Sequence, residues 1–185
     1  MTRIHRAASF AALGGILIFA GSTVRAQSNI NAADRKFMMD SAQGGMAEVA
    51  LGRLASKKGS SASVKQFGRK MVADHSKANG EMKTLAAQKG VGLPPALSEG
   101  DQAEMGRLSK LKGAAFDKEY MNYMTADHRQ DVAEFEKEVG KAKDSDVKNF
   151  AAKTLPALQD HLKMAEKIGG KLGGAAAARS AGRDK

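Results

Sequence analysis

Two segments of this chain are nearly identical: Met71-Val-Ala-Asp-His75 and Met124-Thr-Ala-Asp-His128. The pair Asp160-His161 repeats their last two residues a third time. Each histidine falls near the middle of a long segment with apolar residues at helical spacing, and on the apolar face of that segment. The repeated phrase therefore predicts several long helices around one core, with histidines pointing into it.

Glycine and proline divide the chain into these helices. We expect four long helices: from Asn29 or Asn31 to about residue 58, from a serine at 60, 61 or 63 to 89, from about 114 to 140, and from Asp144 or Ser145 to about 169. Pro156 should kink the last of them or lengthen its hydrogen-bond gap. Ser98 and Asp101 predict a short helix ending near residue 112. Strand patterns are absent and aromatic residues make up only 5%. The sequence predicts an all-α fold: an antiparallel four-helix bundle with a short extra helix in the crossing between helices 2 and 3.

The two ends of the chain differ in composition from the bundle. Residues 1–26 have a basic start, a short apolar run and small residues before Ala26, which is typical of a cleaved signal peptide. An uncleaved anchor is the alternative, but the run is short for a span of roughly 20 residues. Residues 27–171 form the bundle domain, and the small and polar residues 172–185 are expected to be a disordered tail. Because the chain has no cysteine, packing alone must stabilise it.

The net charge of +10 bears on partners. We reject nucleic acid as a partner, because export removes the chain from it and few aromatic residues accompany the basic ones. The basic charge allows loose association with an anionic envelope surface. No transmembrane span is expected after signal removal. A solvated basic surface without a specific partner is favoured over it.

Glu48 is the polar residue at the middle of the first helix, on a face of small residues. Helix midpoints share one level in an antiparallel bundle, so Glu48, His75, His128 and His161 are expected to meet. A carboxylate and neutral imidazoles suit a transition metal such as Zn, Fe or Cu. Neighbouring carboxylates would then orient the histidines as a second layer or act as helix clamps; these are Asp74, Asp127 and Asp160. Thioethers beside the histidines would favour Cu(I), with core filling as the preferred alternative; these are Met71, Met124 and Met164.

Several motifs in order resemble the bacterial family called domain of unknown function 4142, over about residues 31–168. They are Phe37, Gly44-Gly45-Met-Ala-Glu48-Val, Leu51-Gly, Val64-Lys-Gln-Phe67, Met71-Val-Ala-Asp-His75-Ser-Lys-Ala-Asn79, Phe116-Asp117, Tyr120-Met, Asp127-His128, Thr154-Leu-Pro156 and His161-Leu. The resemblance implies an exported, ferritin-like helical bundle, often described as an outer-membrane protein, and implies no activity.

One feature of true ferritins is missing from the sequence. Their di-iron sites use Glu-x-x-His pairs, whereas Val72, Thr125 and Leu158 precede these histidines by three positions. Ferroxidase activity is therefore not expected, and no nucleophile motif or phosphate loop suggests another reaction. The sequence favours a non-catalytic structural or stress-related envelope protein, in the periplasm or at the outer membrane, with a buried polar layer as helix clamp. The alternatives are a periplasmic metal-binding module and a basic membrane-surface protein.

Overall fold

The computed structural model describes residues 30–181, and these form five α-helices and no strand. The helices are α1 (Ala32–Lys58), α2 (Ala62–Lys89), α3 (Glu99–Ser109), α4 (Gly113–Lys141) and α5 (Ser145–Ala181). The predicted all-α class, the four long helices and the short helix in the crossing are confirmed. The signal peptide predicted for residues 1–26 lies outside the described residues.

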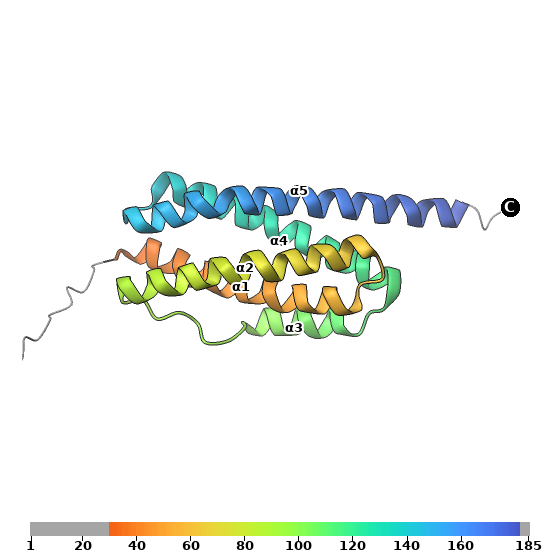
Figure 1. The fold of residues 1–185 in the computed structure, drawn as a ribbon, viewed down its shortest axis with the longest axis horizontal. Coiled ribbons are helices and arrows are strands. Elements are labelled where there is room, and N and C mark those ends of the chain that lie inside the picture. The colour runs from red at the N-terminus through yellow and green to blue at the C-terminus, as the bar shows by residue number, and fades with distance from the viewer. Residues whose placement is uncertain (1–29, 182–185) are drawn as a thin grey trace, which may run out of the picture.

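The four long helices form two hairpins that lie side by side, α1 with α2 and α4 with α5 (Figure 1). The connection through α3 returns along the bundle, so that α4 begins at the end where α2 began (Figure 1). The hairpins pack through α2 against α5 and α1 against α4. Each long helix is therefore antiparallel to both of its neighbours, as predicted.

Side-chain caps fix where the helices begin. Asn31 accepts hydrogen bonds from the backbone N–H groups of Ala33 and Asp34, and Ser61 accepts one from Ser63. Ser98 likewise accepts from the N–H of Asp101. These contacts satisfy N–H groups that the first helical turn leaves without partners, as the sequence predicted.

Helix α5 does not end near residue 169, as expected from its glycines, but continues through Pro156 to Ala181. Residues 172–181, predicted to be part of a disordered tail, are thus helical, while 182–185 lie outside the described part. Alanine has the highest helix propensity, and the run 175–178 offsets a cost of about 1 kcal/mol for each glycine before it.

The two hairpins also share a sequence pattern at a constant separation. Asp34-Arg-Lys-Phe-Met38 corresponds to Asp117-Lys-Glu-Tyr-Met121, and Val64-Lys-Gln-Phe67 corresponds to Val147-Lys-Asn-Phe150. In both cases the separation is 83 positions (34 to 117 and 64 to 147). The chain therefore contains an internal duplication, which the sequence analysis did not detect.

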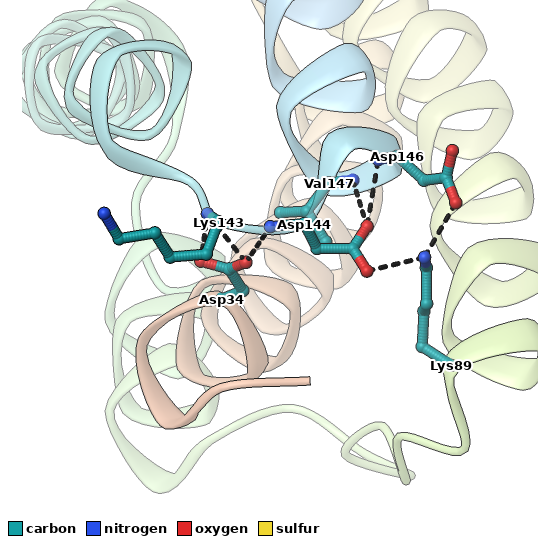
Figure 2. A network of polar contacts seen from close by, with 6 residues as sticks. All are labelled: Asp34, Lys89, Lys143, Asp144, Asp146 and Val147. Carbon is teal, nitrogen blue, oxygen red and sulfur yellow. Dashed lines mark hydrogen bonds and ion pairs between the residues drawn. The ribbon is translucent and has the colours of Figure 1, made fainter. Parts of the chain in front are cut away.

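The same separation relates two reciprocal contacts between the hairpins. Buried Asp117 accepts hydrogen bonds from the backbone N–H groups of Ser60 (2.8 Å) and Ser61 (2.6 Å). Buried Asp34 accepts from Lys143 (3.1 Å) and Asp144 (2.7 Å), which lie 83 positions further on (60 to 143 and 61 to 144; Figure 2). Each hairpin thus holds the turn of the other, as expected for two units related by a pseudo-two-fold axis.

The second of these turns carries a further set of polar contacts (Figure 2). Asp144 caps α5 by accepting from the backbone N–H groups of Asp146 and Val147. Lys89, the last residue of α2, pairs with Asp144 at 2.6 Å and with Asp146 at 2.7 Å. The network joins the ends of α1, α2 and α5.

The core consists of two apolar clusters, one toward each end of the bundle. One contains Phe37, Met38, Met82, Leu85, Phe135, Val147 and Phe150, and the other contains Leu51, Val64, Phe67, Phe116, Tyr120, Met121 and Ala165. Buried Glu48, His75, His128 and His161 belong to neither cluster. The central level of the bundle is therefore polar.

Candidate metal centre

Three imidazole rings meet at this central level, one from each of α2, α4 and α5. The side chains of His75, His128 and His161 retain 5%, 0% and 1% of their exposed surface. Their ring centroids are 5.6, 5.2 and 5.4 Å apart, so they form a nearly equilateral triangle. The predicted inward orientation and shared level of the histidines are both observed.

One nitrogen of each ring is held by an oxygen atom. His128 Nδ1 lies 3.0 Å from the carbonyl oxygen of Met124, and His161 Nε2 lies 2.7 Å from Asp74 Oδ2. His75 Nδ1 lies 2.6 Å from Glu48 Oε2. A carbonyl oxygen or an ionised carboxylate can only accept, so with Glu48 and Asp74 ionised the ring proton lies on these three nitrogens.

The other nitrogen of each ring then carries a free lone pair. Among the described residues, no hydrogen-bond partner reaches the buried atoms His75 Nε2, His128 Nε2 and His161 Nδ1. One ligand atom from each of the three rings lies within 4.8 Å of the other two. Three ring nitrogens at this separation can reach a common ion at about 2.1 Å after small side-chain movements.

Burial sets the protonation of the rings. It lowers the pKa of His75 and His161 to about 4 and that of His128 to about 3. For His128, the neighbouring imidazoles act in the same direction, whereas Asp74 partly opposes the effect at His161. All three rings are therefore neutral at neutral pH, which is the form that binds metal.

Glu48 lies between two of the histidines, as predicted, but on one side of the triangle. Its Oε1 is 3.3 Å from His128 Nε2, while its Oε2 contacts His75. Its carboxylate also groups with Asp127, His128 and Asp131, with ligand atoms within 4.8 Å of one another. Burial raises the pKa of Glu48 and of Asp131 well above their ordinary values, and that of Asp127 to about 6.

The three aspartates that precede the histidines have different surroundings. Asp74 holds His161; burial would raise its pKa, but hydrogen bonds from Lys70 and His161 lower it. Asp127 is half-buried, 4.0 Å from Nδ1 of its own neighbour His128. Asp160 is exposed and is not part of the central layer. The equal spacing in sequence therefore gives only one inter-helix clamp of the predicted kind.

The predicted methionines pack in one apolar cluster. Met71 and Met124 are fully buried there, and Met164 is half-buried against it. This arrangement accords with core filling, the preferred expectation for these residues.

Two histidines of the triangle reach a cavity of about 210 Å³ between α2 and α5. His75 and His161 line it together with apolar or uncharged residues (Ala78, Thr154, Ala157 and Leu158) and with charged ones (Asp74, Lys77, Glu81 and Lys153). The cavity lies beside these two rings, whose unpaired nitrogens are themselves buried.

The duplication shows that the triangle, which combines His75 of the first hairpin with His128 and His161 of the second, is not repeated by symmetry. At a separation of 83 positions, the counterparts of His75, His128 and His161 are Leu158, Gly45 and Ala78. Asp131, in contrast, is the counterpart of Glu48 (48 to 131) and was not predicted from the sequence. The constant separation is the signal that would have revealed it.

The fold and the site define a helical bundle with a buried imidazole centre. The family described as domain of unknown function 4142 matches residues 20–168, and the chain belongs to this family. A comparison with curated proteins gave no match.

Solved structures with the same fold have low sequence identity to this chain. A DUF305 fragment from Deinococcus radiodurans has a TM-score of 0.68 at 14% identity, covering 77% of this chain and 98% of its own. A putative secreted DUF305 protein from Streptomyces coelicolor has a TM-score of 0.64 at 18% identity, covering 76% of this chain and 94% of its own. CopM in the Cu(I)-bound form has a TM-score of 0.62 at 17% identity, covering 72% of this chain and 93% of its own. None of the described helices is long and apolar enough to cross a membrane.

Proposed function

We propose that the protein is an exported metal-binding module whose His75, His128 and His161 hold one transition-metal ion. Two observations carry this proposal: each of the three buried rings has one unpaired nitrogen, and one ring nitrogen of each histidine lies within 4.8 Å of the other two. A carboxylate or carbonyl oxygen fixes the opposite nitrogen of each ring, which is the arrangement that orients histidine ligands in metal sites. Glu48 then orients His75, and Asp74 orients His161.

A purely structural clamp accounts less well for the same layer. A clamp stabilises by satisfying buried polar atoms, and an unsatisfied one costs about 1–3 kcal/mol. Here one nitrogen on each of three rings has no partner in the described part of the chain. An ion bound between the rings would satisfy all three at once.

The ligand set narrows the choice of metal. Neutral imidazole suits copper, zinc and iron, and three such ligands leave a further position open. We favour copper or zinc, since the carboxylates that iron sites of ferritin type require do not share the triangle. The likeness to CopM in the Cu(I)-bound form supports copper.

The location and role belong to the same proposal. The N-terminal 26 residues support export, and one structural relative is described as secreted. We propose a non-catalytic role, such as binding or buffering the ion in the cell envelope, because no nucleophile or phosphate-binding motif adjoins the site.

Metal titration of the purified, untagged chain tests the proposal. Cu(I), Zn(II) and Co(II) would be added to the chelator-treated protein, with binding followed by metal analysis and by the Co(II) visible spectrum. We expect one equivalent, with nitrogen-rich tetrahedral Co(II) bands, and at least a 100-fold affinity loss in His75→Ala.

Asp160→Asn is the matched control, because its side chain is exposed next to His161. It should bind like the unmodified chain, and circular dichroism should show both variants folded. Sub-stoichiometric binding of all three metals, or unchanged affinity in His75→Ala, would contradict the proposal.

A further inference from the structure

The geometry points to a second cation position beside the imidazole triangle, made of the carboxylates of Glu48, Asp127 and Asp131. This position would bind a divalent cation that prefers oxygen ligands, such as Mn(II). The position adjoins the proposed copper or zinc site but does not depend on it.

The internal duplication brings two of these carboxylates together. Glu48 on α1 and Asp131 on α4 are counterparts at the separation of 83 positions, so they approach each other from opposite sides of the pseudo-two-fold axis. Asp127 joins them from one helical turn earlier on α4, and ligand atoms of the three residues lie within 4.8 Å of one another. Three acidic groups from two helices thus share one small volume.

An unpaired buried atom points into this group. Glu48 retains 3% of its exposed surface, and when Glu48 and Asp131 are both ionised, its Oε1 has no hydrogen-bond partner in the described residues. His128 Nε2, fully buried and also without a partner, lies 3.3 Å from it. When Glu48 is ionised, the lone pairs of its Oε1 and of His128 Nε2 repel each other, and a cation beside them removes that repulsion.

The position also has room for solvent ligands. A cavity of about 20 Å³ adjoins Glu48 and Asp131, and Ser41, Asn79 and Thr154 add polar groups to its wall. A volume of about 10–15 Å³ is enough for one water molecule. Mn(II) accepts carboxylate oxygens together with water, whereas copper prefers nitrogen and sulfur.

The two positions must use different ligands. His128 Nδ1 is held by Met124, so its ring offers only Nε2, and one lone pair serves one ion. With Nε2 directed to the imidazole triangle, the carboxylates form the second position. Asp131 then belongs to the oxygen position alone, and His161 to the imidazole position alone.

This separation allows a reciprocal test. Mn(II) binding would be measured by loss of its six-line electron paramagnetic resonance signal, and Zn(II) binding by titration calorimetry, on the full chain and two variants. In Asp131→Asn we expect at least a tenfold loss of Mn(II) affinity with Zn(II) affinity unchanged. In His161→Ala we expect the opposite.

Several results would overturn the second position. These are no Mn(II) binding by the unmodified chain, unchanged Mn(II) affinity in Asp131→Asn, or parallel loss of both metals in His161→Ala, which would mean a single site. Mn(II) binding without Zn(II) or Cu(I) binding would support this position and contradict the proposed function. If circular dichroism shows Asp131→Asn unfolded, Asp127→Asn decides by the same criteria.

Discussion

The depressed histidine pKa values predict that metal binding tolerates acid. An ordinary histidine has a pKa of 6.5, so at pH 5 each free ligand must release a proton before it binds, which weakens binding about 30-fold. A site made of three ordinary histidines would lose metal affinity by a factor on the order of 10⁴ or more. With pKa values of about 4, 3 and 4, the same change in pH should reduce affinity less than twofold.

Zinc affinity measured by equilibrium dialysis between pH 7.5 and 4 checks this expectation. Affinity should stay flat down to about pH 5 and fall only near pH 4, where the buried rings take up protons. A peptide of three unperturbed histidines serves as the reference. A decline that begins near pH 6.5 and follows the peptide would refute buried, neutral ligands.

Folding itself depends on pH in a related way. Since each histidine has a lower pKa in the folded chain than in the unfolded one, the unfolded state holds more protons between pH 6.5 and 4. Each ring therefore removes stability as pH falls through that window, by about 1.4 kcal/mol per pH unit. Glu48, Asp127 and Asp131 act in the opposite direction: their pKa values are raised in the folded chain, that of Asp127 to about 6, so they remove stability as the pH rises. Circular dichroism at each pH identifies the range in which binding is measured on folded protein.

Two further predictions concern the fold that positions the site. In Gly52→Ala, the new Cβ would lie 2.7 Å from the backbone oxygen of Gly68, so the free energy of unfolding, measured by chemical denaturation, should fall by about 2 kcal/mol. In Gly44→Ala, the new Cβ meets open space in the described structure, so the free energy of unfolding should rise by about 0.5–1 kcal/mol. Asp117→Asn should cost about 1–3 kcal/mol, because two part-buried N–H groups lose a charged acceptor, and equal stability to the unmodified chain would disprove that role. Asp34→Asn should cost less, because Asp34 also faces the buried carboxyl group of Glu138.

The sequence was sufficient to predict the helices because their signals are local. Asn31, Ser61 and Ser98 are caps within three residues of the groups they satisfy, and the inward face of each histidine follows from helical periodicity. The predicted end of α5 was wrong, because the prediction gave the glycines more weight than the alanine run that follows them. Glycine disfavours helix there and alanine favours it, so the composition of this segment did not determine where the helix ends.

The parts of the site that were not predicted depend on contacts between distant helices. Asp74, Asp127 and Asp160 have the same position relative to their histidines, yet one holds a ring, one joins an acidic group and one faces solvent. Their different fates follow from which helix lies beside each, and that information is not contained in the local sequence.

The duplication explains why the site is one-sided. Two equivalent hairpins would place equivalent ligands on both sides of the axis, as in the di-iron bundles with two Glu-x-x-His helices. Here Glu48 and Asp131 remain paired across the axis, while His128 stands opposite Gly45, whose Cβ position is taken up by Asn79. A large ring on one side and close helix packing on the other are mutually compatible only if the halves have diverged. Loss of symmetry therefore gives the imidazoles a place on one side of the axis only, and it separates the proposed nitrogen position from the proposed oxygen position at the centre of the same bundle.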